Sequence, residues 1–155
     1  MSSNSVPFHA SHHSVSESAQ SGALTGALVL VGRLLFSIIF IFGGLSNFSH
    51  QTIAYAAAQG VPLASIAVPL AGILSLAGGL SILFGYRARI GAWLLVLFLV
   101  PVTPMMHNFW AVKDPMMAQM QMVNFLKNLA LLGGAFLISH FGAGPWSLDA
   151  RRSTR

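Results

Sequence analysis

Four long apolar runs divide the chain, and short polar segments separate them. The runs cover Leu24–Phe48, Leu63–Phe84, Ile90–Met106 and Pro115–Phe141. A membrane-spanning helix needs about 20 mostly apolar residues, within a usual range of about 17–25. The pattern therefore predicts four spanning helices. Because the connections are short, consecutive helices are expected to be antiparallel neighbours.

Local signals place the ends of this region. Asp114-Pro115 is a favourable helix start, since Asp caps a first turn and Pro fits inside it. The Gly142–Pro145 segment is a poor continuation for a helix. Residues 1–22 are rich in Ser and His without a hydrophobic period, which predicts a disordered tail. We therefore expect a tail at 1–22, a transmembrane domain at 23–149 and a basic tail at 150–155.

Composition makes the membrane assignment firmer. Of 155 residues, 55% are hydrophobic and 7% charged, whereas soluble domains carry about 25% charged residues. The predicted fold class is an all-α, integral membrane four-helix bundle with the lipid bilayer as its main partner. The net charge of +5 comes from a few scattered basic residues, which argues against nucleic-acid binding. The chain has no cysteine, so thiol chemistry and disulfides are excluded.

Basic residues near the span ends predict the orientation. Arg87 and Arg89 lie between the second and third runs, and Arg151, Arg152 and Arg155 follow the fourth. Lys and Arg favour the cytoplasmic side. With an even number of spans, both termini are expected in the cytoplasm.

Polar and small side chains recur on one side of each run. At 100° per residue, the polar arc of the fourth run holds Met117, Met120, Gln121, Asn124, Lys127 and Asn128. The matching row of the first run is Arg33, Ser37, Phe40, Gly44 and Asn47. The second run offers Gly72, Ser75 and Gly79, and His107 follows Thr103 by one turn. Since polar groups in lipid face other helices or a wet cavity, we expect a shared polar interior.

Two cations stand out because no carboxylate lies within a span. Arg33 could extend to the cytoplasmic surface, near Asp149, or face a ligand with oxygen acceptors. Lys127 lies further from either helix end, so its side chain reaches the membrane surface less easily. Lys127 could likewise face a ligand with oxygen acceptors. His107 could be a ligand or an interfacial hydrogen-bonding residue. The candidate ligand-binding residues are Arg33, Ser37, Asn47, Ser75, His107, Gln121, Asn124, Lys127 and Asn128.

Methionines concentrate at the turn between the third and fourth runs. Residues 104–122 hold six of the seven, and thioether sulfur suits Cu(I). Only Met117 and Met120 share the polar arc, and His107 precedes them at the end of the third run. Methionine also fills apolar cores. Copper binding on the outer side is therefore an alternative, and we assign no metal site.

Ordered short motifs give the chain a family resemblance. They are GRLL at 32–35, FIFGGLS at 40–46, GVP at 60–62, AGGL at 77–80, GYRAR at 85–89, HNFW at 107–110, NFLKNLA at 124–130 and SLD at 147–149. Together they resemble the DoxX family of small four-helix bacterial membrane proteins, from about Val31 to Asp149. The resemblance implies an inner-membrane location and a polar core at Arg33, His107, Asn124, Lys127, Asn128 and Asp149.

The resemblance also implies a function. Some family members are membrane subunits of thiosulfate:quinone oxidoreductase, and others are linked to oxidative-stress complexes. Asn47 stands where members often have lysine, and Ser75 where they often have glutamate. The missing glutamate removes a counterion for Arg33 or Lys127. From the two cations without carboxylates, the Asn-rich arc and the resemblance, we expect an accessory subunit that binds a quinone or lipid-like ligand for a soluble redox partner, without activity of its own, as a membrane subunit of an oxidoreductase would be. The alternatives are a component of a small transporter or channel, which would need a homo-oligomer, and a structural adaptor.

Overall fold

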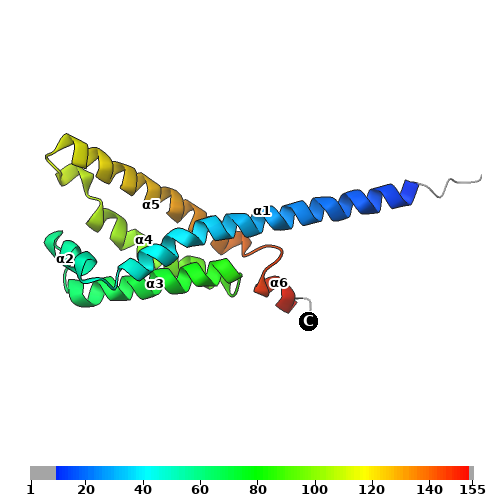
Figure 1. Ribbon diagram of the computed structural model, residues 1–155, viewed down its shortest axis with the longest axis horizontal. Coiled ribbons are helices and arrows are strands. Elements are labelled where there is room, and N and C mark those ends of the chain that lie inside the picture. Colours follow the sequence, from blue (N-terminus) through cyan, green and yellow to red (C-terminus); the bar gives the residue numbers. More distant parts are fainter. Residues whose placement is uncertain (1–9, 154–155) are drawn as a thin grey trace, which may run out of the picture.

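The computed structural model describes the backbone of residues 10–153 and the side chains of residues 20–152, and the described backbone is almost entirely helical (Figure 1). Four long helices correspond to the four apolar runs. They are α1 (Ala10–Ser46), α3 (Ala64–Phe84), α4 (Ala88–Met106) and α5 (Pro115–Phe141). Three short helices join or follow them: α2 (His50–Ala58), the 3-10 helix η1 (Phe109–Ala111) and α6 (Leu148–Ser153).

Helix boundaries follow local chemistry. The Asp114 carboxylate accepts from the Met117 N–H at 2.8 Å, and Pro115 opens α5, so the predicted start is confirmed. Gly85 ends α3 in the left-handed region, with φ 62°. Ser49 caps α2 by accepting from the Thr52 N–H at 3.2 Å. The sequence pattern does not predict α2, because a nine-residue helix between two spans has too few residues to show a clear hydrophobic period.

The N-terminal helix is longer than the hydrophobic pattern indicates. α1 begins at Ala10, inside the segment expected to be a tail. No proline or glycine interrupts residues 10–21, and each residue added to an existing helix gains one backbone bond. Residues 1–9 and 154–155 lie outside the described residues. The division into tails and a central domain stays a prediction.

Four helices are long and apolar enough to cross a membrane, and they cover Gln20–Ser46, Ala64–Phe84, Ala88–Ala111 and Pro115–Phe141. Consecutive long helices run antiparallel, as predicted (Figure 1). α1 packs against α3, α3 against α4, and α4 against α5. Large apolar side chains such as Leu28, Leu35 and Phe42 are more than half exposed. These side chains form the surface that faces lipid, so the chain is an integral membrane four-helix bundle.

The small-residue rows predicted on the first two spans meet. A Cβ on Gly72 of α3 would lie 2.9 Å from the Gly44 carbonyl of α1. One turn further, the buried Ser75 hydroxyl donates to the Phe40 carbonyl at 2.8 Å. Such contacts let two backbones approach closely. The main apolar core follows this seam, with Phe40, Ile82, Leu95, Leu99 and Ala135 buried at its centre.

α5 is the least covered of the four spans, with 11% of its most apolar window buried. It meets α1 near its C-terminal half, where Gly134 lies against the Phe36 ring. Toward the end that carries α2, α5 and α1 diverge (Figure 1). The bundle is therefore closed at the α6 end and more open at the α2 end.

Candidate functional site

The predicted polar residues separate into an end cluster, an interior group and a second end cluster. α4 runs between the two ends, and its 19 residues span roughly 28 Å at about 1.5 Å per residue. The structure therefore does not bring all the predicted residues into one shared interior. The helical wheel gives the side of a helix correctly, but it contains no information on depth along the helix axis.

Arg33 anchors the C-terminal segment at the α6 end. Its side chain is 5% exposed, and its two terminal nitrogens donate to the carbonyls of Ala143 (3.1 Å) and Trp146 (2.7 Å). Its Nε is buried without a partner in the described structure. Backbone carbonyls therefore take the place that we expected a ligand or the Asp149 carboxylate to fill.

The Asp149 carboxylate bonds to the start of α4. Its two carboxylate oxygens accept from the backbone N–H groups of Arg87 (2.8 Å) and Ala88 (3.0 Å) at the start of α4. Its own N–H donates to the Gly85 carbonyl at 2.8 Å. A carboxylate at a helix N-terminus satisfies free N–H groups and complements the helix dipole. Asp149 thus joins α6 to the turn between α3 and α4.

The interior group consists of three buried polar side chains, one each from α1, α3 and α5. Ser37 is fully buried, and its hydroxyl has no hydrogen-bond partner among the described residues. Ser75 uses its hydroxyl to join α3 to α1, and Asn128 of α5 is 8% exposed. The bond made by Ser75 gives this residue a packing role, which requires no ligand.

A chain of side-chain hydrogen bonds crosses the α2 end. The His107 Nδ1 and the Gln121 Oε1 are 2.7 Å apart, and the Gln121 Nε2 donates to the Tyr55 hydroxyl at 3.2 Å. These residues come from the end of α4, from α5 and from α2. Sequence reasoning missed Tyr55, because it lies on the unpredicted helix α2. An aromatic residue near a span end was the only available signal.

A mainly apolar cavity of about 440 Å³ opens beside this chain. Small side chains on one face of α3, including Ala67 and Ala71, line one wall, and Phe98, Pro101 and Met105 of α4 line another. Three polar side chains reach the cavity: Asn47 at the end of α1, Thr52 of α2 and His107. Of the predicted ligand-binding residues, Asn47 and His107 thus share a cavity, and Gln121 is bonded to one of them.

Lys127 and Asn124 lie apart from the cavity lining. The Lys127 ammonium donates to the Asn124 side-chain oxygen at 3.0 Å, and Lys127 is exposed on α5. An uncovered cation within a span costs about 2.5–3.5 kcal/mol on insertion scales. Lys127 and Gly134 are seven residues apart, so both lie on the side of α5 that is turned toward α1. This side is where the bundle opens.

The methionines of α5 are exposed rather than gathered in the interior. Met116, Met117 and Met120 are 77%, 47% and 55% exposed. The described residues contain no group of three or more His, Asp or Glu side chains arranged to hold a metal. Cu(I) binding by Met117, Met120 and His107 stays a prediction.

Comparisons with known proteins agree with the fold. The chain is 33% identical to inner membrane protein YqjF of Escherichia coli K12 over 123 residues, covering 78% of this chain and 88% of the relative. It is 27% identical to inner membrane protein YphA of the same organism over 132 residues, covering 84% and 94%. No solved structure matches. The DoxX family model matches residues 28–108, which run from α1 to the turn after α4 and include Arg33, Ser75 and His107. The chain therefore belongs to the DoxX family.

Proposed function

We propose that this chain is an accessory protein of the bacterial inner membrane that binds a quinone or lipid-like ligand for a redox partner. The relatives YphA and YqjF are both named inner membrane proteins, which supports the location. The basic residues at the α6 end favour a cytoplasmic position for that end and for both termini.

The observation that carries the proposal is the cavity of about 440 Å³ at the α2 end. Ligand sites are typically apolar hollows of about 300–1,000 Å³ with a few polar groups that orient the ligand. Here the apolar walls from α3 and α4 suit a ring or hydrocarbon chain. The Asn47, Thr52 and His107 side chains supply groups that can hydrogen-bond a carbonyl or hydroxyl oxygen.

His107 is the residue best placed to sense the ligand. Its side chain lines the cavity, and its Nδ1 bonds to Gln121, which in turn bonds to Tyr55. Because the Gln121 Oε1 can only accept, the His107 Nδ1 donates to it, which fixes the ring orientation and leaves the Nε2 of a neutral ring as an acceptor. A hydroxyl of a reduced, quinol-type ligand would thus donate to the fixed imidazole, and a quinone carbonyl would accept from Asn47 or Thr52.

The accessory role follows from the residues that the chain lacks. The sequence has no cysteine, so it offers no thiol that could supply electrons. Electrons for quinone reduction would therefore come from a bound cofactor or from a partner, and we propose a soluble redox protein. The exposed polar side of α5 around Lys127 lies within a span, so it offers a surface that a second copy of the chain would cover.

Purified protein tests the proposal. Membrane-extracted chain should carry co-purifying quinone that liquid chromatography and mass spectrometry detect, and decylubiquinone should bind the reconstituted protein. Ala71→Phe places a ring inside the cavity, and we expect affinity to fall at least about tenfold, since such substitutions exclude the ligand sterically. Ala130→Phe, on the exposed side of α5, is the matched control and should bind normally. Equal binding by both variants, or no binding by the wild type, would reject the proposal.

A further inference from the structure

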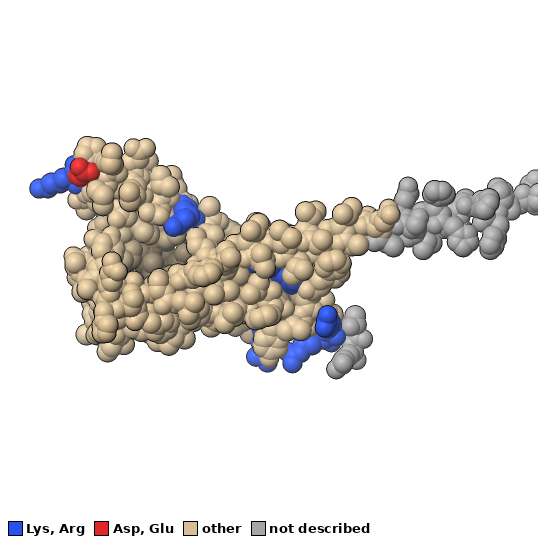
Figure 2. All heavy atoms as spheres, viewed as in Figure 1, with Lys and Arg blue, Asp and Glu red and all other residues tan. Residues whose placement is uncertain are grey.

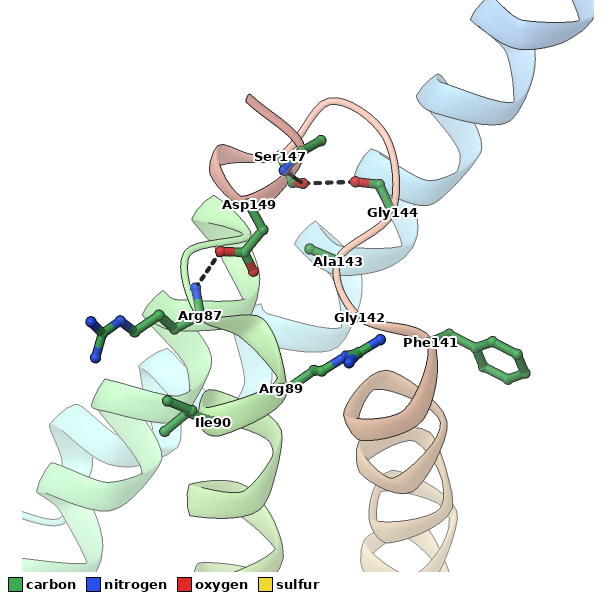
Figure 3. A pocket seen from close by; sticks show the side chains of 10 residues that line it. Arg87, Arg89, Ile90, Phe141, Gly142, Ala143, Gly144, Ser147 and Asp149 are labelled. Carbon is green, nitrogen blue, oxygen red and sulfur yellow. Dashed lines mark hydrogen bonds between the residues drawn. The ribbon is translucent and has the colours of Figure 1, made fainter. Parts of the chain in front are cut away.

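A second hollow, of about 460 Å³, lies at the α6 end of the molecule. Its lining includes Arg87, Arg89 and Ile90 from the first turns of α4, Phe141 and Gly142 from the end of α5, and Asp149. In Figure 3, Arg89 extends from α4 across the gap toward Gly142, whereas the Arg87 side chain points outward at the edge of the hollow. This hollow is separate from the cavity at the α2 end, and it does not depend on the function proposed above.

The charge of the hollow is unbalanced. Both oxygens of Asp149 accept from the backbone N–H groups of Arg87 and Ala88, so its negative charge is held at the start of α4. The other acidic side chain of the described region, Asp114, caps α5 at the far end of the molecule. In Figure 2, several basic side chains lie at the α6 end, and the acidic atoms in view lie at the opposite tip, beside another basic side chain. The guanidinium of Arg89 therefore lacks a carboxylate counterion in the described structure.

The walls of the hollow are fixed in place. Arg33 holds the carbonyls of Ala143 and Trp146, and the Ser147 hydroxyl donates to the Gly144 carbonyl at 2.7 Å. The Asp149 N–H is bonded to the Gly85 carbonyl. These bonds link the segment after α5 to α1 and to the α3–α4 turn. Arg89 consequently faces a preformed wall, which lowers the cost of ordering a ligand.

The membrane side of the hollow is apolar. Ile90 and Phe141 line the hollow and are 54% and 73% exposed. About one turn deeper on each helix, Trp93 of α4 and Phe136 of α5 contact edge to face, with ring centroids 6.1 Å apart. An apolar surface therefore continues from the arginines along α4 and α5. A molecule that matches both parts carries an anionic group and a hydrocarbon chain.

We infer that this hollow binds an anionic phospholipid, with the phosphate against Arg89 and an acyl chain along Ile90 and Phe141. Guanidinium groups bind phosphate through planar, charge-assisted hydrogen bonds, and basic pockets between spanning helices bind lipid head groups. Arg87, at the rim, adds positive charge. The N–H groups at the start of α4 do not contribute, because Asp149 occupies them.

Native mass spectrometry of the full-length protein tests the inference. Wild-type protein, loaded with an equal mixture of phosphatidylglycerol and phosphatidylcholine, should retain phosphatidylglycerol selectively. Arg89→Gln should lower its retention about fivefold, as expected for one basic residue near a lipid surface. Lys113→Gln removes the same charge at the opposite end, and it should leave retention unchanged. Circular dichroism and gel filtration establish that both variants are folded.

Two further arms separate the competing explanations. A free-phosphate site would give inorganic phosphate, at millimolar concentration, the ability to displace the lipid from wild-type protein, and that result would overturn the inference. If Arg89 instead only stabilises the C-terminal end of α5 and binds no lipid, the Arg87→Gln/Arg89→Gln double variant will retain phosphatidylglycerol at the wild-type level. That outcome would overturn it equally. We expect retention to fall about twenty-five-fold in the double variant.

Discussion

Replacing Arg33 with methionine tests how an arginine is tolerated inside a span. The change removes two charge-assisted hydrogen bonds to the Ala143 and Trp146 carbonyls. Each contributes about 1.5–3 kcal/mol, so their loss costs about 3–6 kcal/mol. Removing a cation from the membrane returns about 2.5–3.5 kcal/mol. The net loss of unfolding free energy should be small, about 0–3 kcal/mol.

Lysine at the same position gives a different balance. Arg33→Lys keeps the cation and its transfer cost, but one ammonium replaces the planar fork that reaches two carbonyls. Losing one bond costs about 1.5–3 kcal/mol with nothing returned. We therefore expect the methionine variant to be no less stable than the lysine variant, within about 1 kcal/mol.

Unfolding by sodium dodecyl sulfate in mixed micelles measures the unfolding free energy of the whole protein. Hydrogen exchange measures the local stability of the segment that Arg33 anchors. Amides of residues 142–149 should exchange faster in both variants, because this segment loses its anchor to α1. Leu34→Met, at a neighbouring position that is 49% exposed, is the control and should change stability by less than about 0.5 kcal/mol. A methionine variant destabilised by more than about 4 kcal/mol, beside a lysine variant of wild-type stability, would refute the reasoning. Charge, rather than the fork, would then be the property that matters.

Three further changes probe other contacts. Asp149→Asn leaves one oxygen to cap α4, so stability should fall by about 0.5–2 kcal/mol and amide exchange at Arg87 and Ala88 should rise; unchanged exchange would contradict the cap. Gly72→Ala brings a Cβ to 2.9 Å from the Gly44 carbonyl and should cost about 1–3 kcal/mol in denaturant unfolding. Gly133→Ala, with no neighbour within 4 Å, should be neutral or stabilising, and equal costs would dismiss the close packing. Gln121→Leu removes the bonds to His107 and Tyr55 and should cost about 1–3 kcal/mol, with faster exchange in α2; protection of α2 at the wild-type level would contradict this link.

The four spans were predictable because each is an uninterrupted apolar run with recognisable ends. Asp114-Pro115 and Gly85 set helix limits through local chemistry that is visible in a few residues. The contact of Gly44 and Phe40 with Gly72 and Ser75 was also predictable, since small residues at helical spacing indicate close approach. In each case the deciding interaction is local, or it repeats with the helical period.

The arrangement of the site was less accessible. Arg33 is bonded to carbonyls more than a hundred residues away, and backbone acceptors carry no residue-type signal. The wheel placed Lys127 with Asn128, yet Lys127 is exposed and Asn128 is buried. That difference depends on how α5 diverges from α1, which is a property of packing. The cavity beside His107 depends in the same way on α2, whose sequence is too short to reveal it.

Photoaffinity labelling tests the ligand cavity most directly. Purified protein would be irradiated with an azido-quinone, and the modified peptides would be identified by mass spectrometry with and without excess decylubiquinone. We predict adducts on the walls formed by α3 and α4, within residues 67–74 and 97–107, that the competitor suppresses. Adducts confined to the exposed side of α5, or labelling that the competitor does not suppress, would contradict a quinone site in this cavity.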